Sequence, residues 1–137
     1  MRNDRKGGGY EAVMLTEADY ANLSLLEASA PLRRILETAK VVASDATPAD
    51  VVTMNTQVVL QDETSGERRV LRVVFPSDAN PSAGLISVLE PLGVHLLGAS
   101  AGRVIECALR DGLHHLRVER VLYQPEHSLR TNLIIHQ

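Results

Sequence analysis

Apolar residues in the first third of the chain recur every three or four positions, the spacing of one face of an α-helix. Thr16, followed by acidic residues, can cap a first helix, and Pro31 can open a second one at its first position. We therefore predict an antiparallel helical hairpin over residues 15–46, a short coiled coil with helices of about 12–14 residues. The apolar positions are Tyr20, Leu23, Leu26 and Ala30, then Leu32, Ile35, Leu36, Ala39, Val42 and Ala43.

The apolar period changes to two after residues 44–50, which have the composition of a linker. Residues 58–75 predict two strands joined by a turn at 64–66. A short strand over 86–89 and a short helix over 91–97 follow, because proline opens this helix and glycine ends it. The whole pattern predicts an α+β fold, with the helical hairpin followed by an antiparallel β domain that carries one short helix.

The last hairpin is predicted from an Asp-Gly dipeptide at residues 111–112, which is typical of a two-residue turn between alternating strands. Centring the turn on this dipeptide sets Ile105 opposite Val118. It also sets Glu106 opposite Arg117, a favourable charge pair on the other face. Apolar and charged positions thus agree on one register.

Composition and charge narrow the class of protein. The chain has 137 residues, 45% of them hydrophobic, which is ordinary for one globular domain. A net charge of −3 argues against a protein that coats nucleic acid, and a single cysteine excludes an internal disulfide. No apolar run approaches the ~20 residues that span a bilayer, and no signal peptide is visible. We expect a cytoplasmic monomer with tails at residues 1–14, which should be mobile, and 126–137.

Candidate metal-binding and catalytic residues form no recognisable site in the sequence. His114 and His115 are adjacent in a predicted strand and therefore point to opposite faces. Cys107 is expected to be buried opposite Leu116, with no base in reach. We expect no metal, no cofactor and no catalysis. The histidines are His95, His114, His115, His127 and His136, and the glycines that match no phosphate-loop spacing are Gly93, Gly98 and Gly102.

A basic cluster of Arg68, Arg69 and Arg72 lies on one predicted hairpin. Binding of single-stranded nucleic acid usually needs aromatic side chains on which the bases stack. No aromatic residue is interleaved with these arginines, so we interpret them as a solvated strand face. We expect no direct, sequence-specific binding of nucleic acid.

Several short motifs lie in residues 50–125. They are DVVTMNT at 50–56, RVVFP at 72–76, ISVLEPLG at 86–93, LLG at 96–98 with Gly102, and LYQP at 122–125. In order and spacing they resemble the C-terminal domain of the GreA/GreB family of transcription elongation factors. The short hairpin and the YQPE ending at 123–126 are more similar to the short-armed members of that family, the regulators of nucleoside diphosphate kinase (Rnk).

This resemblance implies an FKBP-like domain that docks on bacterial RNA polymerase at the rim of the secondary channel. In the family, the docking loop precedes the short helix, and here it consists of Glu90, Pro91 and Leu92. Pro91 and Gly93 match the family pattern, whereas Glu90 replaces a residue that is usually small. Arg103 stands where the family often has an aspartate, which reverses a charge near the docking surface.

The hairpin tip consists of Glu27, Ala28 and Ser29, and the resemblance implies that it points into the channel. Gre factors carry an acidic pair at this tip, which holds a catalytic magnesium ion. Here Glu27 is the single tip carboxylate, and Arg33 and Arg34 follow it. We therefore expect a non-enzymatic, Rnk-like regulator that competes with Gre factors without stimulating transcript cleavage, and that influences the level of nucleoside diphosphate kinase.

Three alternatives remain open. The first is a true Gre-type transcript-cleavage and elongation factor. The second is an FKBP-like prolyl isomerase, although such sites are lined by several aromatic residues and only Phe75 and Tyr123 lie in this domain. The third is a regulator of nucleotide metabolism that acts without the polymerase, although no nucleotide-binding fingerprint is present.

Overall fold

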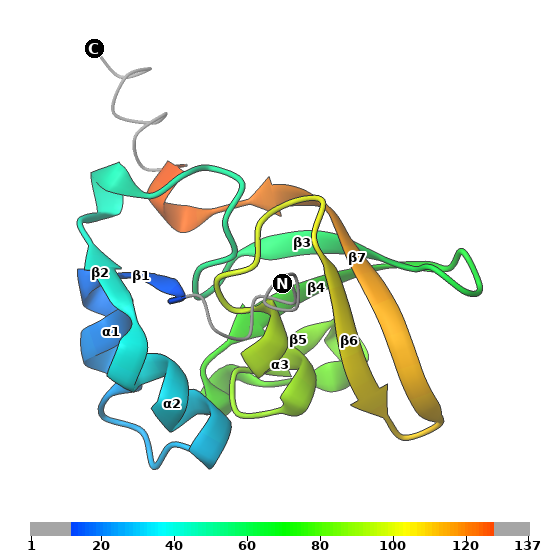
Figure 1. Cartoon of the computed structure of the whole chain (residues 1–137), viewed down its shortest axis with the longest axis horizontal. Coiled ribbons are helices and arrows are strands. Elements are labelled where there is room, and N and C mark those ends of the chain that lie inside the picture. The colour runs from blue at the N-terminus through cyan, green and yellow to red at the C-terminus, as the bar shows by residue number, and fades with distance from the viewer. Residues whose placement is uncertain (1–11, 128–137) are drawn as a thin grey trace, which may run out of the picture.

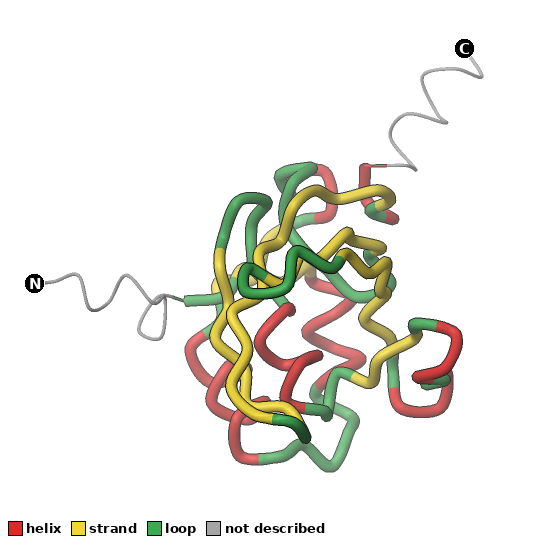
Figure 2. Tube along the Cα trace, turned by 90° about the vertical axis from the view of Figure 1, so that its right-hand side faces the viewer, coloured by secondary structure: helices red, strands yellow, loops and turns green. Residues whose placement is uncertain are grey.

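A computed structural model describes residues 12–127 and shows a curled five-stranded sheet of order β5-β4-β3-β7-β6 (Figure 1). Neighbouring strands pair antiparallel, except that β5 runs parallel to β4. A short helix, α3, contacts β6, and the second view shows helices packed against the inner face of the curled sheet (Figure 2). The elements are β3 Gln57–Asp62, β4 Arg68–Val74, β5 Leu85–Ser87, α3 Pro91–Leu96, β6 Val104–Leu109 and β7 Gly112–Tyr123.

The sheet forms because apolar side chains alternate along its strands. Most inner positions are buried, as Val58 and Val73 illustrate with 0% exposure, whereas the outer positions of β4 include Arg68 and Arg72. The strands and the short helix thus lie close to their predicted positions. The alternation places the core between the sheet and the helices that cover its inner face.

The N-terminal unit consists of two short helices between two short strands, β1 Met14–Thr16, α1 Glu17–Leu23, α2 Ala30–Thr38 and β2 Lys40–Val42. β1 and β2 pair parallel, which the sequence pattern did not predict. The helices have 7 and 9 residues, so the expected length of about 12–14 residues is wrong. The end of the expected second helix is instead extended, because β-branched Val41 and Val42 pair with β1.

The helices of this unit pack on the β domain. Leu15, Leu23 and Leu32 are each 0% exposed and belong to one core cluster with residues of the sheet, such as Val58 and Val118. The coiled coil expected from the sequence is therefore not a separate structure. Helices this short are marginal alone, and burial of their leucines on the domain stabilises them.

A buried polar cluster joins the N-terminal unit to the β domain. Thr16 caps α1 as predicted, since its hydroxyl accepts a hydrogen bond from the backbone N–H of Asp19 at 3.0 Å. The Asp19 carboxylate, 8% exposed, accepts from the N–H of Met54 at 3.1 Å. Nearby, the Thr53 hydroxyl donates to the carboxylate of Glu126 at 2.7 Å. Burial raises the pKa of Asp19 to about 6, and the negative charge of Glu126 contributes to the rise.

The register of the last hairpin differs from the prediction by two residues. Ile105 pairs with Leu116 and Glu106 with His115, and the turn is closed by the pair of Leu109 with Gly112. A slip of two residues keeps every side chain on its own face, so the apolar pattern alone could not distinguish the two registers.

The predicted tails and linker are partly structured. Residues 1–11 and 128–137 lie outside the described residues, but Met14 belongs to β1 and Glu126 is 9% exposed, so both expected tails were too long. The Gln124 side chain donates to the carbonyls of Pro48 and Val51, which fixes the linker. No helix of the described part is long and apolar enough to cross a membrane. The 3-10 turns are Ser44–Ala46, Pro76–Asp78 and Pro81–Ala83.

Candidate functional site

The expected docking loop lies where β5 leads into α3. Glu90 is the N-cap residue of α3, but its side chain makes no capping hydrogen bond and is exposed. Pro91 is also exposed and occupies the first turn of the helix, where its missing N–H has no cost. Leu92 turns inward and packs against the core. The loop therefore presents a carboxylate and a proline ring to solvent on a rigid base.

A close approach of the backbone at Gly93 supports this loop. A Cβ atom at this position would lie within van der Waals overlap of the carbonyl oxygen of Ser87, at the end of β5. Only glycine allows α3 to pack this closely on the strand. The glycine that the resemblance singled out thus has a steric reason, and it positions Glu90 and Pro91.

A cleft of about 210 Å³ opens on the inner face of the sheet next to the expected docking loop. Its floor is apolar, and Leu92 of the loop contributes to it. Charged side chains of both signs form the rest of its lining, including Asp62, Arg69 and His114. The loop and the cleft are therefore adjacent parts of one surface. The leucines of the floor are Leu60, Leu71, Leu92, Leu109 and Leu116.

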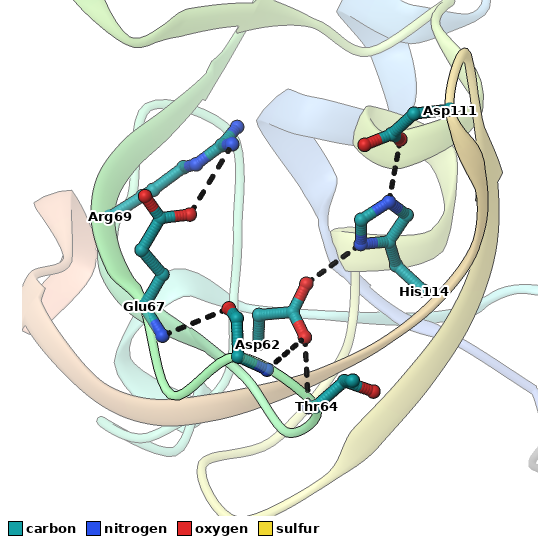
Figure 3. A network of polar contacts seen from close by, with 7 residues as sticks. Asp62, Thr64, Glu67, Arg69, Asp111 and His114 are labelled. Atoms are coloured by element: carbon teal, nitrogen blue, oxygen red, sulfur yellow. Dashed lines mark hydrogen bonds and ion pairs between the residues drawn. The ribbon is translucent and has the colours of Figure 1, made fainter.

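His114 lies between two carboxylates (Figure 3), and all three side chains line this cleft. Its Nδ1 is 2.7 Å from Asp62 Oδ2, and its Nε2 is 2.6 Å from Asp111 Oδ1. A neutral imidazole has one N–H and cannot donate to both, so this arrangement favours the charged form. Accordingly, the bonds to Asp62 and Asp111 raise the pKa of His114, and the bond from His114 lowers the pKa of each carboxyl.

The corrected register places Cys107 across from His114, whereas Leu116 was expected there. A cysteine opposite a histidine is the arrangement of a thiol nucleophile with its base. Both ring nitrogens of His114, however, face carboxylates. Cys107 is 1% exposed, and burial raises the pKa of its thiol. The arrangement therefore stabilises the hairpin and does not activate the sulfur.

The α1–α2 loop, the expected hairpin tip, lies at the end of the N-terminal unit away from β1 and β2 (Figure 1). Ser29 caps α2, so this helix begins at Ala30, one residue before the expected start. The carbonyl of Ala28 accepts a hydrogen bond from Arg33 at 3.0 Å, which places a guanidinium beside the tip. Glu27 is exposed and is the single carboxylate of residues 24–29.

Other residues singled out in the sequence have structural partners. Arg68 forms a bidentate pair with Glu119, and the guanidinium of Arg72 lies 5.1 Å from the centre of the Tyr123 ring. Arg69 points to the opposite face and lines the cleft. Within residues 12–127, no group of three or more histidine, cysteine or acidic side chains could hold a metal ion.

Sequence reasoning missed the Asp62–His114–Asp111 network. Alternation does place Asp62 and His114 on the inner face with leucines. Polar residues at such apolar positions could have indicated a polar network there. Their contact depends on the pairing of β3 with β7, which residues distant in sequence decide.

Comparisons with known proteins agree with this geometry. Residues 47–123 match the family described as "Transcription elongation factor, GreA/GreB, C-term". The chain is 36% identical to "Regulator of nucleoside diphosphate kinase" of Escherichia coli (strain K12) over 83% of its length and 82% of that protein. It is 32% identical to "Transcription elongation factor GreA" of Sulfurovum sp. over 73% of its length, but spans only 62% of that factor.

A solved structure, "Prokaryotic transcription elongation factor GreA/GreB from Nitrosomonas europaea", superposes with a TM-score of 0.71 at 33% identity. The match covers 82% of this chain and 98% of that one. The fold of the described residues, the family match over more than half of the chain and the similarity to the regulators thus agree. The chain belongs to the GreA/GreB family of transcription elongation factors.

Proposed function

We propose that the protein binds bacterial RNA polymerase at the secondary channel, competes there with Gre factors and does not stimulate transcript cleavage. Through transcription it would influence the level of nucleoside diphosphate kinase, in line with the name of the related regulator. The observation that carries the proposal is the α1–α2 loop, with its single carboxylate, Glu27, at the end of two short helices.

Lack of cleavage activity follows from the chemistry of that loop. A catalytic magnesium ion needs several oxygen ligands in octahedral geometry, and a cleavage factor supplies more than one of them. Glu27 is alone, and the bond of Arg33 to the carbonyl of Ala28 holds a positive charge beside it. Helices of 7 and 9 residues are only about 10–14 Å long, so the loop also reaches a short distance.

Polymerase docking is supported by the surface around Glu90 and Pro91. Both side chains are exposed, and the close packing of Gly93 on the end of β5 holds the loop in place. Leu92 of the same loop lines the apolar cleft. A specific interface buries about 1,000 Å² or more, so the loop alone is too small. We infer that the cleft rim contributes to the same contact, with its charges of both signs giving specificity.

A pull-down with core RNA polymerase tests the docking surface. The wild type should be retained and should be displaced by excess Gre factor. Glu90→Lys and Pro91→Ala should each weaken retention about tenfold or more, because they change exposed groups of the loop without altering the core. Arg120→Ala, an exposed change on β7, is the matched control and should bind normally. Failure of the wild type to bind, or equal loss in the control, would contradict the docking proposal.

Two activity assays separate the alternatives. Stalled elongation complexes should show no stimulated cleavage with this protein, and Gre-stimulated cleavage should fall as its concentration rises. A proline-containing peptide should isomerise at the uncatalysed rate. Stimulated cleavage would support a Gre-type factor, and peptide turnover would support an isomerase.

A further inference from the structure

The two edges of the five-stranded sheet differ in whether they are open to a further strand. At one edge, Asn80 exchanges two backbone hydrogen bonds with Leu85, at 2.9 and 3.1 Å, and so partly closes the free side of β5. At the other edge lies β6, which has six residues and, within residues 12–127, pairs only with β7 (Figure 1). An edge strand presents unpaired N–H and C=O groups on which another strand can pair. β6 is therefore the open edge of this sheet.

The hydrogen bonds of β7 show which residues of β6 are open. Val118 exchanges backbone hydrogen bonds with residues 102 and 103, at 2.7 and 2.8 Å, so its backbone faces β6. Backbone groups alternate in direction along a strand, so the residues of β7 two and four positions earlier also face β6. Their partners there are Ile105 and Cys107. The residues of β6 that alternate with these partners direct their N–H and C=O groups away from β7, and they are Val104, Glu106 and Ala108.

These three residues are accessible to a partner. Val104 is 38% exposed, and Glu106 and Ala108 are exposed as well. Among the described residues, the outward backbone groups have one contact, the weak bond from Cys107 Sγ to the carbonyl of Ala108 at 4.0 Å. The strand contains no proline and no lysine, residues that commonly protect an edge from pairing, and Glu106 is its single charged residue.

We propose that the open edge of β6 binds an extended, basic segment of another protein, which adds to the sheet as a sixth strand. One residue of that segment lies directly opposite Glu106, where an opposite charge stabilises the pairing. The Oε2 atom of Glu106 is 3.0 Å from Nε2 of His115, but the Glu106 side chain is 65% exposed and its carboxylate stays accessible. The segment therefore has lysine or arginine opposite Glu106 and apolar side chains two residues away on each side, opposite Val104 and Ala108.

A second copy of this chain fits the edge less well. If β6 paired antiparallel with β6 of another copy so that all three outward residues met, the two Glu106 carboxylates would lie directly opposite each other. Like charges in that position destabilise a pair of strands. The charge of Glu106 thus favours a basic segment over self-association.

Fluorescence anisotropy of a labelled peptide, acetyl-TVTKTVT-amide, mixed with the full chain tests the edge. The wild type should bind it about fivefold more tightly than the peptide TVTETVT, and Glu106→Lys should reverse this preference. Ala108→Pro removes an outward N–H and should weaken binding about tenfold or more. Two methylated peptides give a control that leaves the protein unchanged. N-methylation of the lysine and valines blocks the groups that face β6 and should abolish binding, whereas N-methylation of the inner threonines should not.

Each result has a defined meaning. No binding of TVTKTVT to the wild type overturns the proposal. Equal binding of the lysine and glutamate peptides, or equal loss with both methylated peptides, also overturns it, because the contact would then not use the edge of β6. In size-exclusion chromatography, a dimer of the free chain that Ala108→Pro dissociates would make a second copy the occupant and overturn the choice of partner. Thermal unfolding shows that each variant is folded. None of these measurements involves RNA polymerase, so their failure is distinct from failure of the docking proposal.

Discussion

Replacement of Asp19 by asparagine should make the protein more stable, although it changes a buried, hydrogen-bonded residue. Asp19 is 8% exposed, and its pKa is raised from 3.8 to about 6, first by burial and further by Glu126. Because each pKa unit corresponds to about 1.4 kcal/mol, ionising Asp19 costs the folded state roughly 3 kcal/mol relative to the unfolded chain. The hydrogen bond from Met54 is already included in that shift.

Asparagine keeps an oxygen that can accept the N–H of Met54 and removes the charge. It loses the favourable interaction of a negative charge with the first turn of α1, about 0.3–1 kcal/mol. We therefore expect Asp19→Asn to be about 1–3 kcal/mol more stable than the wild type near neutral pH.

The sign of the pH dependence follows from the raised pKa. Between about pH 4 and pH 6 the folded state holds the Asp19 proton and the unfolded chain does not, so wild-type stability falls as pH rises through this window. Above pH 6 the cost is constant. The advantage of Asp19→Asn should therefore be small near pH 4 and reach its full size above about pH 6.

Urea unfolding from about pH 4 to pH 8 measures the stability gain and its pH dependence. Taking the difference between variant and wild type cancels the titration of other groups. Asp50→Asn removes the same charge from an exposed position and should change stability by less than about 0.5 kcal/mol. An Asp19→Asn variant that is less stable than the wild type, or a stability difference that does not vary with pH, would refute the reasoning.

Two further substitutions test the docking loop and the cleft. Gly93→Ala should lower the free energy of unfolding by about 2–3 kcal/mol or more, because the new Cβ meets the carbonyl of Ser87. Gly66→Ala, with φ of 79° but open space, should cost about 1 kcal/mol, and equal losses in thermal unfolding would argue against the clash. His114→Gln should destabilise the protein more at about pH 5 than at about pH 8. The pKa of His114 is raised, so its charged form stabilises the fold below that pKa. The pKa values of Asp62 and Asp111 are lowered, so these carboxylates contribute stability above theirs. A loss that is uniform across this range, measured by chemical unfolding, would contradict the charged state of the histidine.

The local elements were largely readable from the sequence because their signals are local. Thr16 caps α1 through a contact three residues away, and Pro91 opens α3 in its own first turn. Alternation in β3 and β7 identified the inner faces, since side chains of a strand alternate whatever its partner. The sequence also shows directly that Glu27 is the single carboxylate of its loop.

The helix lengths and the hairpin register could not be predicted from local signals. Val42 continues the apolar spacing of α2, yet pairing with β1 draws it and Val41 into a strand. The register of β6 on β7 depended on a choice between two turns that bury the same side chains. In the first case a tertiary contact, the pairing with β1, overrode the local helical pattern.

Buried charges and clefts depend on contacts between distant segments. Asp19 is charged at a cost because the fold buries it and brings Glu126, far along the chain, close to it, while the N–H of Met54 offsets part of that cost. The cleft between α2 and α3 exists because α2 faces α3 and the segment that holds Arg103. Faces, caps and turns follow from neighbours within a few residues, and the chain alone specifies them. Electrostatic energies depend on distance and burial in three dimensions, so only the packing of the folded protein sets them.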